Sequence, residues 1–360
     1  MQKLLLLGDE AIAQAALDAG LSGVYAYPGT PSTEIMEYVQ RSKQAEAGNV
    51  HRKWSANEKT AMEAAIGMSY AGKRAIVCMK HVGLNVAADP FMNSAITGAN
   101  GGLIVLVADD PSMHSSQDEQ DSRYYARFAQ IPYVEPSNQQ EAYDLTHFAF
   151  ELSERLHTPV LMRVTTRLAH SRAGVVTRES RPQNEINLCG NPKQFILLPA
   201  NARRQYVELI EKNVEFIKSS ETSGNNKYID GTDKSMGIIA SGIAYNYLME
   251  NYPDRNCPYP VLKITQYPLP TAMIEKMADE CESILVAEEG YPLIEEQLRG
   301  ILDRGICVKG RLDGTLPRVG ELNPNFLAVA LGMADPHGAP VPEIVAPRPP
   351  ALCVGCPHID

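Results

Sequence analysis

Short apolar runs alternate with helical patterns along the first half of the chain. The runs at residues 75–79, 103–108 and 159–164 lack the regular polar positions of a half-exposed strand. Continuous apolar strands that alternate with helices are typical of a parallel sheet covered by helices on both faces. The pattern therefore predicts an α/β domain over residues 1–170. Its further strands are expected at residues 4–7, 24–27, 51–54 and 131–134.

The same stretch predicts the helices that connect these strands. Thr30 and Pro31 are expected to open one of them, because threonine is a good N-cap and proline suits the first turn. The helix after residue 56 is rich in alanine and other small residues, so another backbone or a flat ligand could approach it closely. The remaining helices are expected at residues 10–19, 84–99, 119–129 and 139–156.

The pattern changes after residue 170. Between residues 171 and 194 the periodicity fades into Arg, Ser, Asn and Pro, which predicts a linker. A second, smaller α/β domain is expected at residues 195–335, with a polar loop at residues 219–234. The fold class predicted overall is α/β, with two doubly wound parallel-sheet domains. Residues 336–360 are dense in proline, which favours an extended tail.

Composition and charge exclude several classes of protein. The 33 basic and 43 acidic residues give a net charge of −10, whereas a nucleic-acid platform needs a basic face. No apolar run reaches the roughly 20 residues of a membrane helix, and the apolar start at residues 4–7 is too short for a secretory signal. The seven cysteines are scattered and odd in number, so they do not form a disulfide framework. We expect a cytoplasmic protein that binds neither nucleic acid nor membranes.

Candidate chemistry lies after the strands, since ligands of parallel α/β sheets collect at their carboxyl ends. The turn at residues 27–33 presents hydroxyl groups at a helix N-terminus, which suits an anion but also an ordinary capping turn. Glu58 follows the strand at residues 51–54 and lies in the first turn of a helix. Its carboxylate could serve acid–base chemistry, or it could simply compensate the helix dipole.

Two further strand ends carry charged groups. Residues 80–85 include His81, and residues 109–118 combine two adjacent carboxylates with His114. These groups suggest a metal or acid–base site, although neither histidine has a second ligand four residues away, which argues against zinc. In the second domain Glu288 and Glu289 follow a strand, and surface carboxylates that cap a helix are the simplest interpretation.

Several common catalytic motifs are absent from the sequence. No Gly-x-Ser-x-Gly nucleophile elbow occurs, and no Gly-x-x-x-x-Gly-Lys-Ser/Thr loop is present. No Gly-x-Gly-x-x-Gly follows a strand, which removes common dinucleotide chemistry.

Taken together, the strand-end segments resemble the alpha subunits of indolepyruvate:ferredoxin oxidoreductases, within the thiamine diphosphate-dependent 2-oxoacid:ferredoxin oxidoreductases. The resemblance covers the whole chain, and several of its motifs are five residues or longer. The segments that carry it are residues 27–32, 54–59, 80–85, 109–117, 158–163 and 351–358.

This resemblance implies an oxidative decarboxylation, in which an aryl 2-oxoacid, coenzyme A and oxidised ferredoxin give an acyl-coenzyme A, carbon dioxide and reduced ferredoxin. Residues 1–170 would be the pyrimidine-binding domain for thiamine diphosphate, and residues 195–335 a transketolase C-terminal-like domain. Glu58 would hydrogen-bond the aminopyrimidine ring nitrogen. Thr30 matches a threonine placed near the substrate carboxylate, and Gln117 and Arg123 are further candidates for that pocket.

The chain also departs from the family pattern. The Gly-Asp-Gly motif that holds the diphosphate with magnesium is absent, and so is the cysteine-rich iron–sulfur tail. Cys353 and Cys356 resemble ligands of an iron–sulfur cluster, but two thiolates cannot complete a four-ligand cluster. The resemblance thus implies either a truncated chain or a polypeptide that depends on a beta subunit, in a homodimer or heterotetramer. A non-catalytic assembly module and a thiamine-dependent decarboxylase without redox centres remain alternatives.

Overall fold

The computed structural model describes residues 2–333, apart from residues 253, 303, 304, 318 and 319, and also residues 342, 344 and 345. Cys353, Cys356 and nearly all of the proline-rich tail lie outside the described residues.

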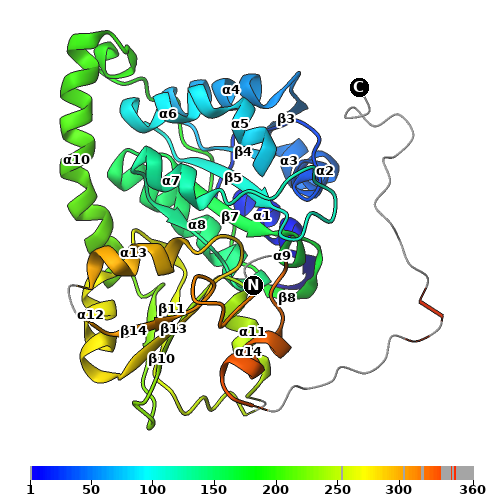
Figure 1. Ribbon diagram of the computed structural model, residues 1–360. Coiled ribbons are helices and arrows are strands. Elements are labelled where there is room, and N and C mark those ends of the chain that lie inside the picture. Colours follow the sequence, from blue (N-terminus) through cyan, green and yellow to red (C-terminus); the bar gives the residue numbers. More distant parts are fainter. Residues whose placement is uncertain are drawn as a thin grey trace.

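The first unit is built on a seven-stranded sheet with mainly parallel strands (Figure 1). Six neighbouring strands, from β6 to β3, run parallel, and β12 joins the edge antiparallel to β6. Their apolar residues form the buried strands expected from the sequence. In sheet order the strands are β12 (Gln266–Tyr267), β6 (Tyr133–Val134), β7 (Val160–Thr165), β5 (Leu103–Asp109), β4 (Ala75–Lys80), β2 (Gly23–Ala26) and β3 (His51–Trp54).

Helices cover both faces of this sheet. Along β4, Ile76 and Cys78 belong to one apolar core, whereas Ala75, Val77 and Met79 belong to the other, as the period of a strand requires. The helices of the unit are α1 (Gly8–Asp18), α2 (Thr33–Arg41), α3 (Lys43–Ala47), α4 (Glu58–Tyr70), α5 (His81–Val86), α6 (Ala88–Thr97), α7 (Arg123–Ala129), α8 (Gln139–Leu156) and α9 (Thr166–His170).

The second unit has a five-stranded sheet in which three strand pairs are parallel and β9 is antiparallel to β11. The α/β class predicted for both units is therefore confirmed. In sheet order its strands are β14 (Cys307–Lys309), β13 (Ser283–Ala287), β10 (Gly237–Ser241), β11 (Val261–Ile264) and β9 (Lys227–Ile229). Its helices are α11 (Ala244–Glu250), α12 (Thr271–Glu280), α13 (Leu293–Ile301) and α14 (Pro324–Ala330).

The two units pack against each other and share two apolar cores. Each of the two large apolar cores contains residues from both, such as Ile76 with Ile238 in one core and Val77 with Ile239 in the other. The long helix α10 (Pro199–Thr222) packs against α6 of the first unit and α12 of the second, and runs along one side of the molecule (Figure 1). None of the described helices has the length and apolar character that crossing a membrane requires.

The structure corrects the prediction for the N-terminal strand. Residues 4–7 do form a strand, β1 (Lys3–Leu7), but it lies outside the seven-stranded sheet and Leu5 is 69% exposed. β1 pairs with β8 (Arg172–Val176), which comes from the segment expected to be a linker. Residues 177–191 then follow the surface of the first unit, where Arg181 and Asn187 donate backbone hydrogen bonds to Asp18 and Ala71. This segment is therefore held on the first unit.

Several helix boundaries also differ from the expectation. The helix expected from Thr30 begins at Thr33, with Ser32 as its N-cap. The helix expected at residues 84–99 is divided into α5 and α6, and that expected at residues 119–129 begins at Arg123. The polar stretch at residues 219–234 is not a continuous loop, since it holds the end of α10 and β9.

Candidate active site

The site lies where the strand order reverses in the seven-stranded sheet. β2 is followed in the chain by β3 on one side, whereas β4 is followed by β5 on the other. Open α/β sheets bind ligands in the crevice outside the carboxyl ends of strands at such a point. The turn after β2 and the start of α5 after β4 both lie at this edge. The two segments are close together. A Cβ added to Gly29, in the turn after β2, would lie only 3.4 Å from Cβ of Lys80, the residue before α5.

Glu58 is the first residue of α4 and is brought to this edge by the end of β3. The side chain of Asn57 caps the helix by accepting a hydrogen bond of 2.9 Å from the Thr60 backbone N–H. Glu58 is only 8% exposed, so its carboxylate does not lie in bulk water as a simple dipole-compensating residue would.

Gly83 in α5 provides the space that Glu58 occupies. A Cβ at Gly83 would lie 2.6 Å from Oε1 of Glu58 and 2.7 Å from its Cγ, which is closer than non-bonded atoms approach. Glycine at this position therefore leaves the carboxylate the space it occupies, and a larger residue would displace it. No hydrogen bond is found for the Glu58 carboxylate within the described part of the chain, so its oxygens remain available to a ligand.

The turn that carries Thr30 is fixed by its own hydroxyl groups. The backbone N–H and Oγ of Ser32 both donate to the Gly29 carbonyl at 2.9 Å, and the Gly29 N–H donates to Oγ1 of Thr33 at 3.0 Å. Thr30 itself is exposed, and its carbonyl accepts a long contact of 3.5 Å from Oγ of Ser115. The turn therefore presents Thr30 to solvent beside the loop that follows β5.

Asp110 organises that loop. It accepts hydrogen bonds from the Ser115 N–H, from Oγ of Ser116 and from Oγ1 of Thr166, at 2.8, 2.6 and 2.6 Å. Burial acts to raise the pKa of Asp110, but these hydrogen bonds hold it below its ordinary value. Lys80 donates to the Ser115 carbonyl at 2.5 Å, and burial lowers the pKa of this lysine. The sequence singled out both segments but not this arrangement of Asp110.

Gln117 lies in the same loop and is exposed. The next residue, Asp118, accepts a contact of 3.2 Å at its carbonyl from Nε2 of the buried His81. The structure thus brings Glu58, Thr30 and Gln117 to elements that meet at one edge of the sheet. His114 and His81 do not share a ligand group with the two aspartates among the described residues.

Arg123 lies elsewhere, which corrects the expectation that it helps to bind substrate. It is fully buried and donates to Asp121 and Glu288 at 2.9 and 3.0 Å, and to the carbonyl of Tyr291 at 2.8 Å. The guanidinium N–H groups of Arg123 therefore form hydrogen bonds that connect the two units. We leave Arg123 out of the proposed substrate site.

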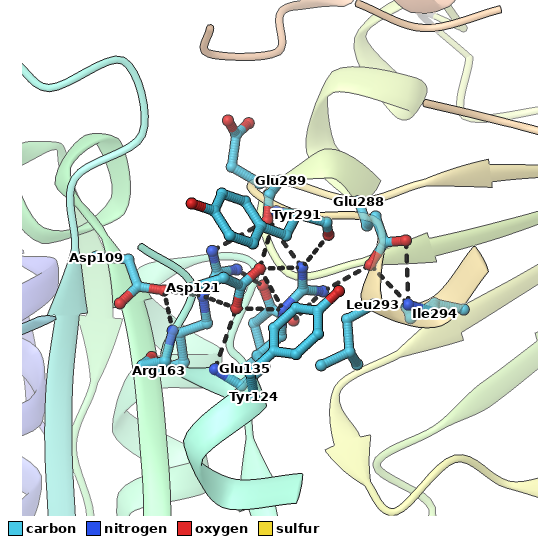
Figure 2. A network of polar contacts seen from close by, with 12 residues as sticks. Asp109, Asp121, Tyr124, Glu135, Arg163, Glu288, Glu289, Tyr291, Leu293 and Ile294 are labelled. Carbon is cyan, nitrogen blue, oxygen red and sulfur yellow. Dashed lines mark hydrogen bonds and ion pairs between the residues drawn. The ribbon is translucent and has the colours of Figure 1, made fainter. Parts of the chain in front are cut away.

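This contact, which we call the interdomain charge network, consists of Asp109, Asp121, Arg123, Glu135, Arg163, Glu288, Glu289 and Arg311. Arg163 donates to Asp109 at 2.5 Å and to Glu135, and also to the Glu289 carbonyl at 3.0 Å (Figure 2). Its five carboxyl groups outnumber its three guanidinium groups. Burial raises the pKa of Glu288 and of Glu289 to about 7.

Glu288 and Glu289 are therefore not surface residues, as the simplest interpretation of the sequence suggested. Both are 1% exposed. Glu288 nevertheless caps α13, because it accepts the N–H groups of Ile294 and Glu295, whereas Glu289 accepts that of Leu322.

Comparison with known proteins shows the family. Residues 14–201 match the family described as pyruvate flavodoxin/ferredoxin oxidoreductase, thiamine diphosphate-binding, which is more than half of the chain. The chain is 41% identical to the indolepyruvate oxidoreductase subunit IorA of Methanothermobacter thermautotrophicus and to that of Archaeoglobus fulgidus. Each alignment covers 99% of this chain but only 59% and 60% of those proteins. The chain thus spans about three fifths of the length of these relatives.

A solved structure shares the fold. The chain resembles the 2-oxoglutarate:ferredoxin oxidoreductase of Magnetococcus marinus with a TM-score of 0.74 and 15% identity, over 92% of this chain and 65% of that one. From the match over residues 14–201 and this likeness in fold, the chain belongs to the pyruvate flavodoxin/ferredoxin oxidoreductase family, of which it carries the thiamine diphosphate-binding domain.

Proposed function

We propose that this chain binds the aminopyrimidine half of thiamine diphosphate in an oxidoreductase that decarboxylates aryl 2-oxoacids of the indolepyruvate type. The observation that carries this proposal is the buried Glu58 carboxylate, which has space secured by Gly83 and no hydrogen bond within the described part of the chain. A largely buried carboxylate at the start of a helix fits a ring nitrogen that must gain and lose a proton.

The residues of this chain would hold and orient the reacting groups. Glu58 would hydrogen-bond the ring nitrogen of the aminopyrimidine and hold a proton there, an interaction that low local dielectric strengthens. When bound, thiamine diphosphate supplies the nucleophilic carbon and takes up the electron pair left by carbon dioxide. The exposed Thr30 hydroxyl would donate to the substrate carboxylate, with Gln117 on the facing loop as a second polar contact.

Other parts of the reaction belong to the whole enzyme. The 2-oxoacid would lose carbon dioxide, its acyl group would pass to the thiol of coenzyme A, and the released electrons would reduce ferredoxin through iron–sulfur clusters. The diphosphate would be held with magnesium by a domain outside this chain, and a beta subunit would complete the assembly, in a homodimer or heterotetramer. The 41% identity to subunits named as indolepyruvate oxidoreductase favours this substrate class. A role for Cys353 and Cys356 in iron binding and a cytoplasmic location stay predictions.

Glu58→Gln in the complete assembly tests the proposal. The amide keeps the shape of the side chain but cannot exchange a proton with the ring nitrogen, so we expect kcat to fall by about 10²-fold or more. Indolepyruvate-dependent reduction of ferredoxin and release of carbon dioxide would be measured together. Glu63→Gln is the matched control, because Glu63 lies on the same helix with an exposed side chain.

Each result has a distinct meaning. Loss of both products in the Glu58 variant, with unchanged thermal unfolding and normal activity of the control, would support the proposal. Full turnover in the Glu58 variant would remove Glu58 from the mechanism. Release of carbon dioxide without reduction of ferredoxin in the parent assembly would identify a non-redox decarboxylase instead.

A further inference from the structure

Three ligand-type side chains meet behind the Thr30 turn, outside the proposed active site. Asp9 lies in the first turn of α1, Glu34 lies in the first turn of α2, and His170 is the last residue of α9. One oxygen of each carboxylate and one imidazole nitrogen all lie within 4.8 Å of one another. The group is assembled from three helices that are far apart in the sequence.

Asp9 is the unusual member of this group. Its side chain is fully buried, and neither carboxylate oxygen has a hydrogen-bond partner within the described part of the chain. Oε2 of Glu34 is likewise buried without a partner there. An ionised carboxylate in such a position is strongly unfavourable unless a cation or a proton neutralises it. Burial, followed by the charges of Glu34 and Glu10, raises the pKa of Asp9 well above its ordinary value.

The distance between His170 and Glu34 is compatible with a shared ion, as well as with the ion pair that the two side chains form by themselves. Nε2 of His170 lies 3.4 Å from Oε1 of Glu34. A charge-assisted hydrogen bond between such atoms is shorter, at about 2.7–2.9 Å. Two ligands that each lie about 2.0–2.1 Å from one tetrahedral ion are about 3.3–3.4 Å apart.

We propose that Asp9, Glu34 and His170 bind one divalent cation of the Zn²⁺ type. The donor set combines one imidazole with two carboxylates, and imidazole favours transition metals over Mg²⁺ or Ca²⁺. The two carboxylates balance the charge of the ion, which resolves the unpaired buried position of Asp9. Glu34 and His170 are about one third exposed, so water can reach the ion and complete its coordination.

The position of this site gives the ion a structural role. Glu34 follows the Thr30 turn by four residues, and His170 follows Thr166, which holds Asp110 in place. An ion bound here would fix the start of α2 against α1 and α9. It would thereby stabilise the two loops that face the crevice without touching substrate.

Titration of the 360-residue chain with ZnCl₂ tests this proposal. Cys353→Ser and Cys356→Ser are introduced in every sample, because these thiols could bind Zn²⁺ on their own. Calorimetry, and metal analysis after desalting, should give one bound Zn²⁺ per chain. His170→Gln should weaken binding at least 10-fold, since even loss of a residue that supports a metal ligand costs about 10–100-fold. Bound Zn²⁺ should also raise the Tm of the parent but not of this variant.

Two further variants make the result decisive. Asp9→Asn keeps the shape of the side chain and should remove the same Zn²⁺ as His170→Gln does. Glu321→Gln is the matched control and should leave Zn²⁺ affinity and stoichiometry unchanged, because Glu321 forms a similar carboxylate–imidazole pair with His114 at 3.4 Å, but no third ligand joins that pair among the described residues. If Asp9→Asn fails to fold, the variant of His170, whose side chain is about one third exposed, still decides.

Unchanged Zn²⁺ affinity and stoichiometry in His170→Gln, or no binding by the parent, would overturn the proposal and leave Asp9 as a buried neutral acid. Because the readouts are metal content and thermal stability, the result is independent of the proposed activity.

Discussion

Gly83→Ala should separate the position of Glu58 from its chemistry. The added Cβ would lie 2.6 Å from Oε1 of Glu58, whereas ordinary contact begins near 3.4 Å, so the carboxylate must move by about 0.8 Å. The clashing atoms, which include Cγ as well as Oε1, all belong to the Glu58 side chain and none to the backbone, so rotation of that side chain can relieve the contact. A displacement of about 1 Å at a reacting group can lower a rate about 10²-fold, and we expect a loss of that order in kcat. Stability should hold or rise by up to about 1 kcal/mol, since alanine is the better helix former.

The assay is indolepyruvate-dependent reduction of ferredoxin by the complete assembly, alongside thermal unfolding of each variant. Gly67→Ala is the control, since Gly67 lies in α4 with Glu58 and a Cβ there would meet no atom within 4 Å. It should share the gain in helix propensity and keep full activity. Normal kcat in Gly83→Ala, or a loss of activity that only follows a loss of fold, would refute the placement of Glu58.

The interdomain charge network supports two further predictions. Arg123→Met should lower the free energy of unfolding by about 3–5 kcal/mol, because it removes a cation that pairs with the buried Asp121 and Glu288. Urea unfolding measures this change. Arg127→Met, at an exposed position on the same helix, is the control and should lower the free energy of unfolding little. An equal cost for both substitutions would contradict the importance of the network. The free energy of unfolding should also fall as the pH rises from about 4.5 to 7. Burial raises the pKa of Glu288 and of Glu289 to about 7. In this range the folded chain therefore retains protons that the unfolded chain has released. Urea midpoints across this range would show the slope, which the double variant Glu288→Gln, Glu289→Gln should flatten; an unchanged slope would contradict the assignment.

Much of the fold could be predicted because its signals are local. The apolar runs that became β4, β5 and β7 are buried at nearly every position, and a run of this kind permits few other structures. β1 was harder, because its leucines show the same apolar pattern while the strand pairs with β8, which follows it by more than 160 residues. A four-residue apolar run does not indicate which other strand it will pair with.

The candidate site divides in the same way. Glu58 could be identified because its position after a strand and at a helix start is readable in the sequence, and the structure adds that Gly83 shapes its surroundings. Arg123 was a candidate for the substrate pocket only through the family resemblance, whereas the fold turns its side chain into the contact between the units.

The sequence by itself determined the α/β class, the parallel strands and the acidic residue at the start of α4, because hydrophobic period and capping residues act over a few positions. Only the tertiary structure decided that Asp9, Glu34 and His170 share one location and that Glu288 and Glu289 are buried. Such juxtapositions arise from the packing of whole helices and sheets. The charge environment of a side chain depends on neighbours that its local sequence does not contain.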